Sequence, residues 1–153
     1  MKKTGFIFGI LMLLSASLFA QSIKEEDGVY KVGTKLYSGH YASVFENGNI
    51  KMEMNLRKGL KNGEVRVYFE NGNLNEIRYY KKNAIDGAWA TYNENGTKVA
   101  IANYKNGKKH GEWKVWDENG RLIYEMNYRN GKKSGTWKRY SPENGEVTGK
   151  RTF

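Results

Sequence analysis

The residue types that most often carry out chemistry are scarce in this chain, which has two histidines and no cysteine among 153 residues. His40 and His110 stand alone, whereas a zinc site needs three or four ligands. No serine lies in a nucleophile-elbow motif, and the glycines follow no phosphate-loop lysine pattern. We therefore expect no enzyme activity, no metal site and no cofactor, with a carbohydrate-active enzyme built on two close carboxylates as a minor alternative.

The side chains that could act by binding are cations, and the formal net charge is +10. They gather in short segments that recur along the chain, and a row of them could hold an anionic partner. The alternative is that these cations only keep the protein soluble and prevent sheet edges from pairing. The candidate basic ridge consists of Arg57, Lys58, Lys61, Lys81, Lys82, Lys105, Lys108, Lys109, Arg129, Lys132 and Lys133. Acidic side chains gather in the alternate segments, at Glu46, Glu70, Glu94, Asp117, Glu118, Glu143 and Glu146.

A 24-residue repeat organises these segments, and it is marked by glycines and aromatic residues. Asn-Gly pairs follow the first four marking glycines by eight residues and the last by nine, and tryptophan or tyrosine recurs at fixed positions between them. Abundant tyrosine and tryptophan with a single proline favour β-strands over disorder. The marking glycines are Gly39, Gly63, Gly87, Gly111 and Gly135.

The Asn-Gly pairs at 47–48, 71–72, 95–96 and 119–120 predict two-residue type I′ turns that connect antiparallel strands. Such a turn at 119–120 places Trp113 opposite Met126, Val115 opposite Tyr124, and Gly111 opposite Tyr128. We therefore expect an all-β antiparallel meander, twisted or rolled, with two strands per repeat and no helix in the mature chain. All acidic turns would lie along one border of this sheet and all basic turns along the other.

The second turn of each repeat is expected to be wider. If its centre lies twelve residues after the first, it forms a four-residue loop from Asn130 to Lys133, with Tyr128 opposite Gly135. Ser141-Pro142-Glu143 would lengthen the last Asn-Gly turn by one residue.

Side chains alternate between the two faces of a strand, so the register assigns each aromatic residue to a face. Ile50, Met52, Met54 and Leu56 share the expected core face with Trp113. A thinner stripe on the opposite face is our candidate aromatic contact patch, although cross-strand stabilisation explains it equally well. The stripe consists of Tyr68, Tyr92, Trp116 and Tyr140.

The N-terminus has the anatomy of a signal peptide, with Lys2 and Lys3 before an apolar stretch from Phe6 to Phe19. We expect a signal peptide at 1–20 and export to the periplasm or outside the cell. A capping strand or half repeat is expected at 21–38. Tandem repeats then follow over 39–153, with units at 39–62, 63–86, 87–110 and 111–134 and a partial unit at 135–153.

The residues of this unit resemble the bacterial variant of the MORN repeat. The pattern is clearest in GEWKVWDENGRLIYEMNYRNGKKSG, from Gly111 to Gly135, and the resemblance covers residues 28 to about 149. The resemblance implies a β-meander used for protein or membrane contact and scaffolding, with no catalytic residues to carry over. Bacterial members are often labelled YwqK-type antitoxins.

Together these features predict an exported, non-catalytic binding or scaffold protein. The alternative is an antitoxin or immunity protein that neutralises a toxin by binding it. A protein is the expected partner, with an anionic membrane or envelope surface, or a second copy of the chain, as alternatives. Nucleic acid is not expected, because export separates the protein from it.

Overall fold

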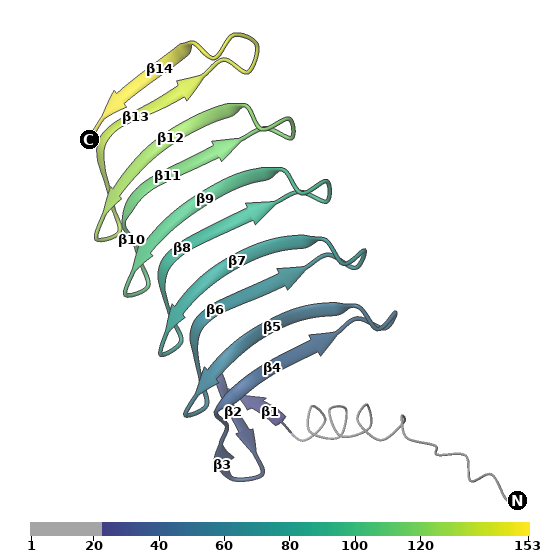
Figure 1. Ribbon diagram of the computed structural model, residues 1–153. Helices are drawn as coiled ribbons and strands as arrows, with labels where there is room; N and C mark the ends of the chain where they lie inside the picture. The colour runs from purple at the N-terminus through teal and green to yellow at the C-terminus, as the bar shows by residue number, and fades with distance from the viewer. Residues whose placement is uncertain (1–22) are drawn as a thin grey trace, which may run out of the picture.

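The computed structural model describes residues 23–153, so the expected signal peptide lies outside the described part of the chain. These residues form fourteen β-strands and no helix (Figure 1). Accordingly, residues 23–153 contain no helix that could cross a membrane. The strands are β1 (Ile23–Glu26), β2 (Val29–Val32), β3 (Lys35–Leu36), β4 (Gly39–Val44), β5 (Ile50–Arg57), β6 (Leu60–Tyr68), β7 (Leu74–Lys81), β8 (Ala84–Tyr92), β9 (Lys98–Lys105), β10 (Lys108–Lys109), β11 (Gly111–Trp116), β12 (Leu122–Arg129), β13 (Lys132–Tyr140) and β14 (Val147–Thr152).

The prediction of an antiparallel meander is confirmed. Strands β4 to β14 form one sheet in which neighbours in space are neighbours in sequence, and β10 is a short strand that pairs with β9 beside its turn. The sheet is open, with β4 at one end and β14 at the other (Figure 1). The predicted register of the fourth repeat is also correct, since Gly111 lies opposite Tyr128, Trp113 opposite Met126 and Val115 opposite Tyr124.

The predicted turn types are wrong, because the tight turns and the wide turns are exchanged. The basic turns are the two-residue type I′ turns, with positive φ at both central residues: Lys58-Gly59, Lys82-Asn83, Asn106-Gly107 and Asn130-Gly131. Arg129 therefore pairs with Lys132 across a two-residue loop, in place of the expected four-residue loop.

The acidic turns are wider. In the loop that follows β11, Asp117 N donates to the Arg121 carbonyl at 2.9 Å and Gly120 N donates to the Asp117 carbonyl at 3.0 Å. Gly120 has a φ of 78°, while Asn119 stays out of the left-handed region. This combination is a type I turn followed by a glycine bulge. The predicted register is nevertheless correct for most of the hairpin. The pairing of β11 with β12 shifts by one residue between Val115 and Trp116, and this shift compensates for the wider turn.

The marking glycines place bulges in the strands that follow the basic turns. Met54 pairs with Val65 while Leu56 pairs with Lys61, so β6 carries two additional residues around Gly63, whose φ is 97°. The same irregularity around Gly135 places Tyr128 opposite Lys133, so the predicted pairing of Tyr128 with Gly135 is wrong. A glycine suits this position because side chains rarely adopt such a φ.

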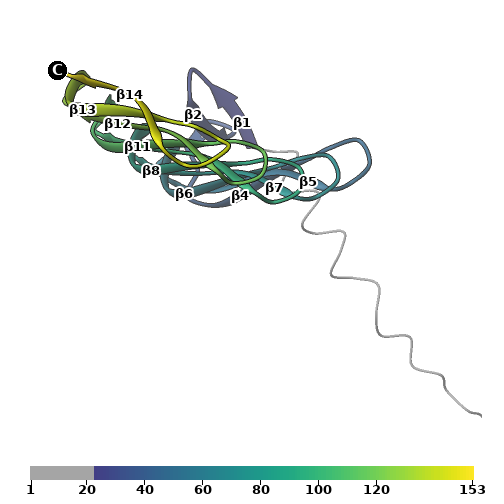
Figure 2. The same ribbon diagram turned by 90° about the horizontal axis from the view of Figure 1, so that it is seen from above.

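Residues 23–36 form a separate three-stranded sheet, β1–β3, where the sequence suggested one strand leading into Gly39. This small sheet lies on one side of the long sheet (Figure 2). Its Tyr30 is 6% exposed and packs with Met54, Leu56 and Val65, which are 1%, 4% and 2% exposed. Full burial of such a side chain contributes about 1.5–3 kcal/mol. The most buried cluster of the described chain therefore lies at its N-terminal end.

We call the side of the long sheet that contacts Tyr30 the aromatic face, because Tyr41, Trp89, Trp113 and Trp137 also lie on it. The other side, which carries Glu53, Arg66, Lys114 and Glu125, is the polar face. Ile50 does not reach the core as predicted, because the strands slip between Ser43 and Val44 and leave it 43% exposed.

Candidate binding surfaces

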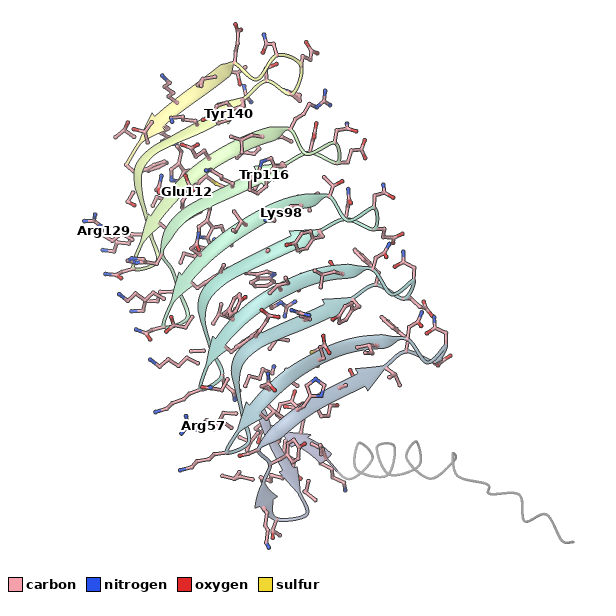
Figure 3. All side chains as sticks on the ribbon, viewed as in Figure 1. Arg57, Lys98, Glu112, Trp116, Arg129 and Tyr140 are labelled. Atoms are coloured by element: carbon pink, nitrogen blue, oxygen red, sulfur yellow. The ribbon has the colours of Figure 1, made fainter. Side chains whose placement is uncertain are left out.

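All residues of the candidate basic ridge lie at or beside the four type I′ turns, along one border of the long sheet. We call this the basic border. Arg57 and Arg129 extend outward from it, three repeats apart along the sheet (Figure 3). Successive basic turns are separated by two strands, which is roughly 9–10 Å. This spacing is close to the Debye length of about 8 Å at physiological ionic strength, so the potentials of neighbouring turns partly add.

None of the ridge cations forms an ion pair within residues 23–153. The ion pairs in this part of the chain use other cations: Lys31, His40, Arg66, Arg78, Lys114, Arg121 and Lys138. Three ridge lysines instead bend over rings of the aromatic face. Lys61 lies 5.5 Å from the Tyr80 centroid, Lys109 lies 4.4 Å from that of Trp113, and Lys133 lies 4.6 Å from that of Trp137. The other ridge cations are exposed.

The opposite, acidic border is tied together by asparagine side chains. Asn49 Nδ2 donates to the carbonyl of Glu70 at 2.9 Å, and Asn73 Nδ2 donates to that of Glu94 at 2.7 Å. Each bond links a loop to the equivalent loop of the next repeat. The glutamate carboxylates at these loops remain exposed, so the border presents a fixed row of negative charge.

The aromatic stripe lies on the polar face, where its side chains bind neighbours within the sheet. The Tyr68 hydroxyl donates to Glu53, and the Tyr140 hydroxyl donates to Glu125 at 3.4 Å. Tyr92 lies under Lys98, whose Nζ is 5.7 Å from the ring centroid. Trp116 and Tyr140 occupy equivalent places on successive repeats (Figure 3). These contacts are the ones that cross-strand stabilisation would produce.

The polar face also holds a charged cluster that the sequence reasoning missed. His40, Glu53, Glu64 and Arg66 line a hollow of about 220 Å³, and Arg66 Nε lies 2.5 Å from a Glu64 oxygen. The predicted hairpin register could have found this cluster, because Glu53 pairs directly with Arg66.

This cluster is poorly suited to catalysis. A glycosidase acid needs a carboxyl with a raised pKa. The hydrogen bond from Tyr79, followed by those from Arg66, instead lowers the pKa of Glu64. Residues 23–153 also contain no group of three metal-ligating side chains.

The aromatic face carries a continuous ladder of rings from β9 to the last residue, Phe153. Neighbouring centroids along Tyr104, Trp113, Tyr128, Trp137 and Phe153 are 5.2, 5.0, 5.2 and 4.8 Å apart. The rings are tilted by 52° to 56° to one another. A hollow of about 260 Å³ lies at the end of the ladder, between Trp137, Arg139 and Arg151. The sequence placed Trp113 and Tyr128 on the expected core face, but the described chain covers only the N-terminal part of this face.

Comparison with known families assigns the repeats. The MORN repeat variant matches residues 61–82, 85–106 and 109–130. Residues 61–130 are MORN variant repeats. The three matched segments begin at intervals of 24 residues, and each contains one acidic loop and ends at a basic turn. MORN repeats are in general non-catalytic scaffolds. No curated protein matches the chain.

Proposed function

We propose that this MORN-repeat protein is an exported binding or scaffold module whose basic border holds the acidic surface of a partner protein. The observation that carries the proposal is the row of ridge cations on four successive turns, with no carboxylate partner within residues 23–153. Natural sheets often carry a lysine at an edge, but here the cations lie at turns between paired strands, where there is no edge to protect.

The meander holds these charges in a fixed row. Turns that are hydrogen-bonded to the preceding hairpin cannot move independently: Asn83 N donates to the Lys61 carbonyl at 3.0 Å and Gly131 N donates to the Lys109 carbonyl at 2.8 Å. A single exposed ion pair contributes only about 0.2–1 kcal/mol. Several pairs formed at once on a fixed row give useful affinity, and their sum falls steeply as salt is added.

The experiment captures partners with the full chain, expressed with its own N-terminal segment and a C-terminal tag. Envelope and extracellular fractions are passed over it at low and moderate salt. The test variant reverses four border charges: Lys81→Glu, Lys105→Glu, Lys108→Glu and Lys132→Glu. These positions are chosen because Lys58 and Lys82 have positive φ, where a substitution would also change backbone strain.

The matched control reverses four exposed lysines elsewhere, Lys24, Lys51, Lys98 and Lys150, so both variants have the same net charge. We expect a protein that is retained at low salt, released at moderate salt, lost by the border variant and kept by the control. If both variants lose the partner equally, its binding depends on the net charge of the protein and not on the basic border. Binding to anionic vesicles without any captured protein would assign the border to a membrane. A toxin among the captured proteins would narrow the function to immunity.

A further inference from the structure

The aromatic face is covered at one end only. Under β1–β3, Met54 and Val65 are 1% and 2% exposed. The positions equivalent to Met54 and Val65 in later repeats, Met126 and Trp113, are half-buried, and no other strand within residues 23–153 lies over them. The same rows of the sheet therefore change from a core to an open surface.

The segment that covers the first end shows what this face accepts. Tyr30 inserts its ring beside Tyr41, with centroids 5.3 Å apart, and its N–H donates to the Gly59 carbonyl of the first basic turn at 2.9 Å. The tip of the hairpin is acidic, with the sequence Glu25-Glu26-Asp27-Gly28. This tip reaches the next basic turn, where Asn83 Nδ2 donates to the Gly28 carbonyl at 2.7 Å. The occupant is thus a β-hairpin with an aromatic side chain and a negative turn.

The same attachment points recur, unused, in the later repeats. The carbonyls of Gly107 and Gly131 correspond to that of Gly59, but they accept no hydrogen bond from residues 23–153. In the later repeats, the rings from Tyr104 to Phe153 provide the aromatic contact that the Tyr41 ring provides in the first repeat.

The charge of the open surface selects a negative occupant. Over β9–β14 the aromatic face carries Lys109, Lys133, Arg139 and Arg151, whereas the carboxylates of these strands lie on the polar face or the acidic border. Two copies packed face to face would bring these cations together, which disfavours a symmetric dimer.

The rings are also poorly arranged for sugar stacking. Lys109 lies 4.4 and 4.9 Å from the centroids of Trp113 and Tyr128, so an ammonium group already covers the ring faces. Neighbouring rings are tilted by more than 50° and do not form a flat platform.

We propose that the aromatic face over β9–β14 binds a β-hairpin of a partner protein, one that carries an aromatic side chain and an acidic turn, as β1–β2 does. This inference rests on the proposed binding function and deepens it, because it names the chemistry of the partner. The hairpin adds its aromatic ring to the ladder and places its carboxylates beside Lys109 and Lys133.

A peptide of residues 23–37, cyclised to hold the hairpin, is the probe for the full chain. The peptide contains no tryptophan, and all tryptophans of the chain lie between residues 89 and 137, so tryptophan fluorescence reports on the open half. We expect a saturable fluorescence change. A peptide with Tyr30→Ala should bind roughly tenfold more weakly, since central aromatic residues dominate such interfaces. A peptide with Glu25, Glu26 and Asp27 changed to lysine should bind more weakly still.

Lys109→Gln and Lys133→Gln in the protein each weaken binding of the unaltered peptide by about fivefold, the upper range for an exposed ion pair. The border variant described above, which leaves both residues intact, reduces peptide binding by less than either. The proposal is overturned if no saturable change occurs, if the lysine-tipped peptide binds as well, or if light scattering shows a dimer that already covers the tryptophans.

The two proposals fail separately. Partner capture that survives while the peptide does not bind would overturn only the hairpin inference. If the peptide binds but the basic border captures no partner protein, the hairpin site on the aromatic face is supported and the proposed function is refuted.

Discussion

Two methionines provide a direct test of where the stability of this sheet lies. Met54 and Met126 follow their marking glycines, Gly39 and Gly111, by the same number of residues, so they occupy equivalent sites on β5 and β12. Met54 is 1% exposed beneath Tyr30. Met126 is half-buried and lines the open hollow beside Trp137.

The expected losses differ because only one substitution leaves a closed cavity. Met54→Ala removes a fully buried side chain that β1–β3 and the sheet enclose, and such substitutions cost about 2–5 kcal/mol. Met126→Ala removes partial burial, and solvent fills the vacated space. Full burial of methionine is worth about 1.5–3 kcal/mol, so roughly half of that, about 0.8–1.5 kcal/mol, is expected.

The assay is urea unfolding of both variants, followed by circular dichroism for the whole sheet and by tryptophan fluorescence for the C-terminal half. Two probes are needed because repeats that contact only their neighbours can unfold in stages. Met54→Ala should shift the dichroism transition more than Met126→Ala does, while Met126→Ala shifts chiefly the fluorescence transition. Equal losses at the two sites would refute a core concentrated under β1–β3.

Two pairs of substitutions and a pH titration test local features. Trp113→Phe should lower the free energy of unfolding by about 1 kcal/mol more than Trp89→Phe, as measured by urea unfolding. Trp113 Nε1 donates to a backbone carbonyl at 2.9 Å, whereas Trp89 Nε1 has no partner among the described residues. Equal costs would contradict this hydrogen bond. Gly59→Ala and Gly131→Ala share a left-handed cost of roughly 1–2 kcal/mol. Only at Gly59 would the new Cβ also meet neighbouring atoms at 2.9 Å. Gly59→Ala should therefore lower the free energy of unfolding more than Gly131→Ala does. It should also loosen β1–β3, which limited proteolysis would detect. Burial raises the pKa of Tyr30 from 10.0 to about 12, so the unfolded chain ionises first and stability falls as pH rises from 10 to 12. Tyr30→Phe should weaken this dependence, and a variant with the same pH profile as the unaltered protein would refute the assignment to Tyr30.

The exchanged turn types show where local sequence was ambiguous. Asn-Gly suits both a type I′ turn and a type I turn with a glycine bulge, since glycine has positive φ in either. A second set of Asn-Gly pairs, at 106–107 and 130–131, occupies the tight basic turns and was the better signal. In the first set, asparagine side chains cap their own loops, as when Asn73 N donates to Asn71 Oδ1 at 2.9 Å, which favours the wider form.

The cover provided by β1–β3 could not be predicted from local pattern. The sequence from residue 28 to 38 resembles a half repeat, so it gives no sign of a separate sheet that covers its neighbours. Only the three-dimensional arrangement brings Gly28 to Asn83, which is 55 residues away. The charged cluster around Arg66 was a different kind of miss, because the predicted register already paired Glu53 with Arg66.

The sequence by itself determined the repeat, the strands, the two faces and the separation of basic from acidic turns. These properties follow from side-chain alternation and from the turn preferences of glycine and asparagine, which act over a few residues. Tertiary structure decided where the glycine bulges shift the register and which half of the aromatic face is covered. Those outcomes depend on contacts between segments distant in the chain, because an open sheet buries an aromatic residue only where another segment lies over it.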